Sequence, residues 1–282
     1  MSEIAIEMKN VCKHYSGHRV LEDFSLSVPK GAVYALLGNN GAGKSTSIRI
    51  MTGQLAADSG TVAVLGLDPL KNAVALRLRM GYVPETERLF DFLTPTELFG
   101  FLNHFFPDWS MERATELLGE FHLPPDRKIG SFSRGMYAKT ALITVMARKA
   151  EVVIFDDPVL GLDTVSRADF MDGLIRSIQE YEHTILVSSH LIPEIEGICD
   201  HAGILAEGKL LYSGETEHLK ARFRRIRLAG EDGLLRGEIC RKSIAGEPYA
   251  VVDVSENVEL QEKGETMNLE EIFLALTRAV GP

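Results

Sequence analysis

The chain has 282 residues, of which 45% are hydrophobic, and this is enough apolar material for a large α/β core or a core with a small appendage. Thirty basic and forty acidic residues give a net charge of −10, which argues against a broad nucleic-acid-binding face, so we expect no nucleic-acid partner. The three cysteines are far apart and lack metal-ligand spacing, which excludes a disulfide framework and favours reduced thiols.

The apolar runs are short. The longest of them, such as 32–37, 141–147 and 152–155, fall well below the roughly 18 residues that a membrane-spanning helix needs. The segment 1–10 carries two glutamates and lacks the basic start and apolar stretch of a secretory signal. We therefore expect the chain in the cytoplasm.

The first part of the chain predicts strands and then a glycine-rich loop. Residues 4–28 alternate in short β-like runs around a turn at 16–18, which indicates an antiparallel edge sheet. An apolar strand at 33–37 stops at Gly38, and a helical pattern follows over 44–51. Two further buried strands, 152–155 and 184–187, end in polar residues, and open parallel sheets place ligands at such strand ends.

The middle and the end of the chain have different patterns. Helical periodicity over 96–147, interrupted by prolines at 107 and 124–125, predicts a helical subdomain inserted at about 86–148. After Lys220 the pattern changes to glycine-broken alternation, with strand candidates at Val251, Val252 and Val254 and a closing helix over 269–277. We expect a core over 1–220 and a small accessory region over 221–282.

The glycine-rich loop has the spacing of a phosphate-binding loop. It reads Gly38-Asn39-Asn40-Gly41-Ala42-Gly43-Lys44-Ser45, and Thr46 continues into the helix. Successive backbone N–H groups curl around phosphate oxygens, the lysine reaches the β- and γ-phosphates, and the serine hydroxyl is a Mg²⁺ ligand. A glycine turn that only caps a helix would not need the lysine and serine in register.

Asp156 ends the strand 152–155 and is the natural second Mg²⁺ ligand, although an acidic residue there could also cap the next helix. Together with the loop at Gly38, it predicts an α/β P-loop nucleoside triphosphatase that uses ATP and Mg²⁺.

At these residues the chain resembles the ATP-binding cassette (ABC) family over about 4–220. The family fold that this implies is a mixed sheet core with an antiparallel β subdomain and an inserted helical subdomain. The motifs that carry the resemblance are the adenine-stacking Tyr15, the Q-loop-like Gly81-Tyr82-Val83-Pro84-Glu85, the signature-like Phe132-Ser133-Arg134-Gly135-Met136, the D-loop-like segment from Asp157 to Asp163, and the switch-like Ser188-Ser189-His190.

The resemblance implies that two cassettes face each other with ATP between the phosphate loop of one and the signature of the other. Ser133 and Gly135 would then contact the partner's γ-phosphate. The implied catalytic residues are Lys44, Asp157 and His190; the implied nucleotide ligands also include Tyr15, Gly38 to Thr46 and Asp163; the implied metal ligands are Ser45, Asp156 and Glu85. The implied partner is a separate integral-membrane permease, with the cassette on the cytoplasmic face of the membrane.

Some of these residues have a plainer interpretation when each is taken alone. Tyr15 would be a half-buried strand aromatic, His190 a hydrogen-bonded histidine at a strand end, and Ser133 a helix N-cap.

The chain departs from the commonest family pattern at three places. Glu85 replaces the usual glutamine, Arg134 and Met136 replace glycine and glutamine, and Asp157 replaces the catalytic glutamate. Two functions therefore stay open: an ATPase that powers a permease, and a weakly hydrolysing structural half of a heterodimer. A cassette acting on ribosomes or DNA would need two fused cassettes or a long insertion. Within the family, the signature variant and the ending 268–273 look most like ATPases of drug or antibiotic-peptide exporters.

Overall fold

The computed structural model describes residues 3–86, 89–180, 183–228, 235–244, 247–255, 260, 262 and 264–280. A six-stranded sheet with the order β5-β6-β7-β3-β8-β9 forms its centre. These strands are β5 (Met80–Val83), β6 (Val152–Asp156), β7 (Thr184–Ser189), β3 (Val33–Gly38), β8 (His201–Ala206) and β9 (Lys209–Glu215). The first five are parallel and β9 is antiparallel. Strands β3, β6 and β7 are buried along their whole length, as continuous apolar runs in parallel sheets require.

A second sheet is antiparallel, with the order β2-β1-β4. Its strands are β1 (Ile4–Tyr15), β2 (His18–Pro29) and β4 (Ser59–Val64). In β2 the buried Phe24, Leu26 and Val28 alternate with exposed residues, so only one face of this sheet enters a core. That core also receives Ile48 and Met51 from α1 (Lys44–Met51), the helix that follows β3. The short helix α2 (Ala73–Arg77) precedes β5.

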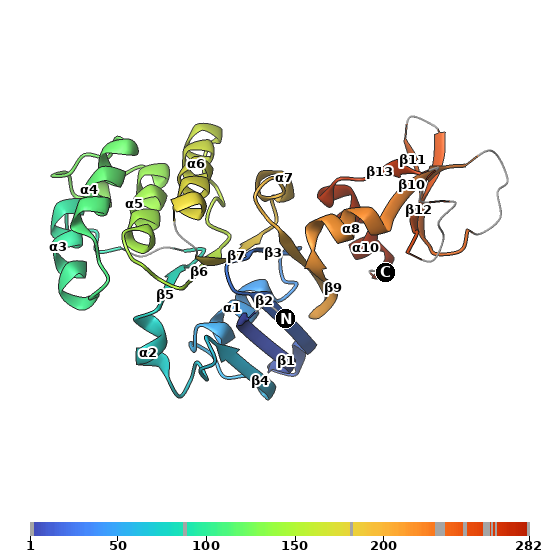
Figure 1. The fold of residues 1–282 in the computed structure, drawn as a ribbon, viewed down its shortest axis with the longest axis horizontal. Helices are drawn as coiled ribbons and strands as arrows, with labels where there is room; N and C mark the ends of the chain where they lie inside the picture. Colours follow the sequence, from blue (N-terminus) through green and yellow to red (C-terminus); the bar gives the residue numbers. More distant parts are fainter. Residues whose placement is uncertain are drawn as a thin grey trace.

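Three helices between β5 and β6 form the inserted subdomain, at one end of the molecule (Figure 1). They are α3 (Pro95–Phe105), α4 (Met111–Glu120) and α5 (Arg134–Met146), with a 3-10 turn at Ile129–Ser131. Each helix has an N-cap hydroxyl: Thr94 in a capping box with Glu97, Ser110 for α4 and Ser133 for α5. The local sequence therefore fixes where each of these helices begins.

The chain then forms α6 (Thr164–Glu180) and α7 (Ile192–Ile195), and ends in a unit at the opposite end of the molecule (Figure 1). That unit contains α8 (Thr216–Arg222), α10 (Leu269–Val280) and a sheet with the order β11-β12-β10-β13. Its strands are β10 (Phe223–Arg227), β11 (Glu238–Ile244), β12 (Glu247–Asp253) and β13 (Glu265–Thr266). Leu269 and Ile272 of α10 belong to the main hydrophobic core, whereas Leu228 and Val252 lie in a small separate cluster.

The α/β class, the antiparallel unit and the inserted helices are confirmed. Two predicted boundaries were displaced: β12 ends at Asp253, so the buried Val254 lies outside the strand, and the closing helix continues to Val280. No helix in the described part of the chain has the length and apolar character that crossing a membrane requires.

Candidate nucleotide site

The loop between β3 and α1 folds around the side chain of Lys44. Its Nζ donates hydrogen bonds to the Gly38 carbonyl at 2.7 Å and to the Asn39 carbonyl at 3.3 Å, and the residue is only 6% exposed. Burial lowers the pKa of Lys44, while the nearby carboxylates of Asp157, Asp156 and Glu85 act in the opposite direction. A buried cation is thus held at the loop, with acidic groups on its open side.

Glycine is required at the last loop position before the helix. Gly43 has a φ of 114°, and a Cβ there would lie 2.9 Å from the Val20 carbonyl oxygen. Because Gly43 is the N-cap of α1 and no side chain caps that end, the first N–H groups of the helix have no side-chain acceptor in this loop. Such N–H groups, at the positive end of a helix, are suited to bind an anion.

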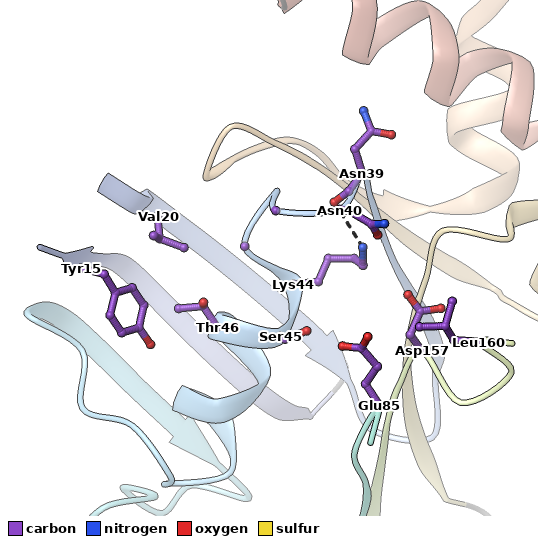
Figure 2. Close-up of a pocket in the computed structure, with 12 residues that line it drawn as sticks. Tyr15, Val20, Asn39, Asn40, Lys44, Ser45, Thr46, Glu85, Asp157 and Leu160 are labelled. Carbon is purple, nitrogen blue, oxygen red and sulfur yellow. Dashed lines mark hydrogen bonds between the residues drawn. The ribbon is translucent and has the colours of Figure 1, made fainter. Parts of the chain in front are cut away.

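A pocket of about 410 Å³ opens over this loop. Figure 2 shows Tyr15 at one end of the pocket and Asp157 at the other, with Lys44 and Ser45 between them. The pocket is lined by Tyr15, Val20, Asn39, Asn40, Gly41, Gly43, Lys44, Ser45, Thr46, Glu85, Asp157 and Leu160. Of the predicted loop residues, Gly38 and Ala42 do not line it, although the Gly38 carbonyl accepts a hydrogen bond from Lys44.

Three oxygen-bearing side chains converge beside the loop. Ser45 Oγ donates to Asp156 Oδ1 at 3.2 Å, and Ser188 Oγ donates to the same oxygen at 2.7 Å. Ser188 reaches Asp156 because the two residues are partners in the parallel β6–β7 register. Ser45 and Asp156 supply the hard oxygen ligands that Mg²⁺ prefers, so the site fits this ion. Ser188 was not predicted as a site residue, although its place at the end of a buried strand was a visible signal.

Asp157 and His190 form a pair at the far end of the pocket. His190 Nδ1 lies 2.9 Å from Asp157 Oδ1 and 2.8 Å from Oδ2, and the Asp157 N–H donates to Ser188 Oγ at 3.0 Å. Asp157 has a φ of 50°, a left-handed conformation that non-glycine residues seldom adopt and that aspartate tolerates better than most. The carboxylate is therefore held in place by both its backbone and a histidine ring.

Tyr15 is 41% exposed, and the carboxylate of Asp58 binds both of the residues that precede it, Lys13 and His14. Asp58 accepts a bond from Lys13 Nζ at 2.7 Å and from the His14 N–H at 2.7 Å, and its other contact is the His14 ring at 3.1 Å. The Lys13 bond is the main reason why the pKa of Asp58 falls to about 2. Asp58 thus connects the end of β1 to the loop after α1, a connection that the sequence did not reveal.

Ser133, Gly135 and Asp163 lie outside the pocket but close to one another. Asp163 Oδ1 accepts from the Ser166 N–H at 2.9 Å, and its Oδ2 accepts from Ser166 Oγ at 2.7 Å, bonds that lower the pKa of Asp163. A Cβ on Gly135 would lie 2.1 Å from that same Ser166 Oγ. Ser133 accepts from the Met136 N–H at 3.3 Å as the N-cap of α5. These predicted residues therefore form a second cluster, where α5 and α6 begin.

Comparison with known proteins agrees with this geometry. The sequence model of the family described as ABC transporter matches residues 21–160. The chain is 31% identical over 226 residues to the daunorubicin resistance ATP-binding protein DrrA3 of Streptomyces coeruleorubidus, covering 78% of this chain and 71% of that protein. The chain belongs to the ABC transporter family. As an ABC cassette it is an ATP-binding subunit of a transporter, with ATP hydrolysis coupled to transport.

Other relatives agree with this assignment. The cassette is 30% identical over 255 residues to the bacitracin transport ATP-binding protein BcrA of Enterococcus faecalis, with 89% of this chain and 82% of that protein covered. It is 28% identical to a solved "ATP binding subunit of ABC transporter", with a TM-score of 0.70 over 77% of this chain and 92% of the other. The predicted family is confirmed, whereas the role of each site residue stays a prediction.

Proposed function

We propose that this ABC cassette is the ATP-hydrolysing subunit of an exporter and powers a separate integral-membrane permease from the cytoplasmic face. The observation that carries the proposal is the pocket over the phosphate loop, which is lined by the buried cation Lys44, by Ser45 and by Asp157. Asp156 is bonded to this Ser45, and His190 to this Asp157. The names of DrrA3 and BcrA, which refer to daunorubicin resistance and bacitracin transport, support the export of a drug or an antibiotic peptide.

In this proposal Lys44 and the loop N–H groups hold the phosphates, and Tyr15 stacks on adenine. Ser45 and Asp156 would hold Mg²⁺, with Glu85 beside them, and the ion would neutralise charge on the β- and γ-phosphates. Asp157 accepts a hydrogen bond from the attacking water, and His190 keeps the Asp157 carboxylate in place. Each of these groups lies in or next to the pocket.

The cluster at Ser133, Gly135 and Asp163 supports a site that a second cassette completes. These residues lie at the starts of α5 and α6 and do not line this protomer's own pocket. A hydroxyl and a backbone N–H facing a partner's γ-phosphate would add fixed donors where charge resides in phosphoryl transfer. We further propose that 1–220 is the cassette proper and 221–282 an accessory region that packs on it through α10.

Replacing Ser133 with alanine should weaken the ATP-dependent association of cassettes without weakening ATP binding by the monomer. The variant is made in an Asp157→Asn background, so that slow hydrolysis does not remove ATP from the dimer. Light scattering with and without MgATP measures the mass. We expect the dimer dissociation constant to rise by at least about tenfold, because each charge-assisted hydrogen bond that is lost contributes about 1.5–3 kcal/mol.

Ser110→Ala is the matched control, because Ser110 is also an N-cap serine and accepts from the Arg113 N–H at 3.1 Å. Both changes remove a cap, which costs about 0.5–2 kcal/mol of stability. Only Ser133→Ala should change the association. A mass that ATP leaves unchanged, both for the chain alone and for its mixture with a second cassette, would contradict the two-cassette proposal.

Replacing Tyr15 with alanine should raise the Kd for ATP by about tenfold, because stacking of a base on an aromatic ring contributes about 1–3 kcal/mol. Inorganic triphosphate lacks a base, so its affinity should stay the same. Calorimetric titration of each variant with both ligands measures the difference. An equal loss for both ligands would mean that Tyr15 supports the pocket without contacting adenine.

Asp157 favours a second candidate function, the weakly hydrolysing half of a heterodimer. Aspartate is one methylene shorter than the family's glutamate, and here its carboxylate already has His190 as a partner. Steady-state ATPase measurements on the purified chain, alone and with its permease, separate the two functions. A rate that stays at the buffer background in both samples would favour the structural half.

A further inference from the structure

An ion pair outside the pocket joins the two segments that carry Asp157 and His190. Arg167, in the first turns of α6, places its Nη1 at 2.5 Å from Glu194 Oε1 in α7. The same guanidinium donates from Nη2 to the Leu162 carbonyl at 3.2 Å, in the loop between β6 and α6. One side chain therefore contacts both the loop that follows Asp157 and the helix that follows His190.

Short backbone hydrogen bonds extend this contact to the pocket on both sides. On one side the Leu160 N–H donates to the Asp157 carbonyl at 3.1 Å, and the Leu162 N–H donates to the Val159 carbonyl at 3.2 Å. Two successive turns thus connect Asp157 to Leu162, whose carbonyl accepts the hydrogen bond from Arg167. Hydrogen bonds therefore restrain the backbone between Asp157 and Leu162.

On the other side, the Leu191 N–H donates to Ser189 Oγ at 2.9 Å, and the Glu194 N–H donates to the Leu191 carbonyl at 3.3 Å. Ile192 of this turn is buried. The direct Asp157–His190 bond and the Arg167–Glu194 pair therefore close a ring of contacts, in which each link restrains the other.

The Arg167–Glu194 ion pair is partly buried, and one contact, from Nη1 to Oε1, joins its two side chains. The side chains of Arg167 and Glu194 are 29% and 22% exposed. Within the described residues, the buried Arg167 Nε and Glu194 Oε2 have no hydrogen-bond partner. Removing one member would leave the other charge partly buried with still fewer partners. Breaking this pair should therefore cost more free energy than breaking an exposed one.

We propose that Arg167 and Glu194 are positioning residues that hold His190 against Asp157. The effect of this pair on the reaction rate rests on the proposed function. Its effect on the position of the His190 ring does not, because that position can be observed without turnover. Neither residue lines the nucleotide pocket, so the pair acts on the rate through His190 and Asp157 and not by touching ATP.

The test compares Arg167→Met with Arg176→Met, a matched control on the same helix. Arg176 also binds a carboxylate, Glu120 at 2.9 Å, and a backbone carbonyl, that of Asp172 at 3.3 Å, but neither leads to the pocket. We expect Arg167→Met to lower kcat by about tenfold through misplacement of the pair, with the ATP Kd changed less than about twofold. Arg176→Met should change neither value.

Three more variants separate positioning from a loss of stability. Glu194→Gln preserves the shape of the side chain and should lower kcat to the same extent as Arg167→Met. The double variant should be no slower than Arg167→Met alone, because that change already breaks the Arg167–Glu194 pair. Arg167→Lys should recover part of the rate. Additive losses in the double variant would overturn the proposal.

The ring of His190 provides the decisive measurement. Its imidazole nitrogen resonances, assigned by comparison with His190→Gln, should shift in Arg167→Met and Glu194→Gln but not in Arg176→Met. Unshifted resonances overturn the link whatever the rate does. Shifted resonances with an unchanged kcat support the link and instead count against the reaction roles given to Asp157 and His190.

Discussion

Lys44→Ala is expected to raise the Kd for MgATP at least about a hundredfold, because this lysine would bind both the β- and the γ-phosphate and each hydrogen bond between charged groups contributes about 1.5–3 kcal/mol. The change acts in two ways. It removes the ammonium that faces the pocket, and it also removes the bonds that draw the Gly38 and Asn39 carbonyls together. Calorimetric titration of the apo protein with MgATP measures the loss.

The control is Lys30→Ala, which removes a lysine that pairs with Glu3 at 3.1 Å and lies outside the nucleotide pocket. Its ATP affinity should equal that of the unmodified chain. Thermal unfolding of both variants shows whether the Lys44→Ala protein is folded. A folded Lys44→Ala protein that binds ATP normally would overturn the phosphate-loop assignment.

Asp157→Asn is expected to lower kcat by about a hundredfold while the ATP affinity stays within about twofold, because a group that positions the attacking water acts on the reaction and not on ground-state binding. Asparagine also tolerates the left-handed backbone at this position, so the fold should persist. Single-turnover hydrolysis of bound ATP measures the rate. Asp172→Asn, on the exposed face of α6, is the control for loss of one negative charge.

Asp157→Glu tests the length of the side chain. The extra methylene would advance the carboxylate by on the order of 1 Å, and misplacement of this size can cost about a hundredfold in rate. We therefore expect Asp157→Glu to raise turnover, with little change in ATP affinity. Glutamate fits a φ of 50° less well than aspartate, so the variant should also unfold at a slightly lower temperature.

Two results would contradict the role given to Asp157. Hydrolysis by Asp157→Asn at the unmodified rate would show that another group positions the water. An Asp157→Glu variant slower than the unmodified chain would show that the loop from Pro158 to Asp163 already places the shorter carboxylate correctly, and that His190 is matched to it.

The local features of this protein follow from its sequence. The strand at 33–37, the loop to Ser45 and the helix at 44–51 were all predictable, because a buried apolar run, glycines with a required spacing and a 3.6-residue period are properties of neighbouring residues. The N-caps at Ser110 and Ser133 and the proline breaks at 107 and 124–125 likewise fix the helices of the inserted subdomain.

Only the tertiary structure decided which distant residues meet. Ser188 reaches Asp156 through the register of two parallel strands that lie far apart in the chain. Asp58 contacts Lys13 and His14 although two strands and a helix separate them in the sequence. Arg167 meets Glu194 because α6 and α7 lie on the same side of the central sheet (Figure 1). Such contacts depend on strand order and helix packing, which arise from burial of the whole core, so no local pattern of residues contains them.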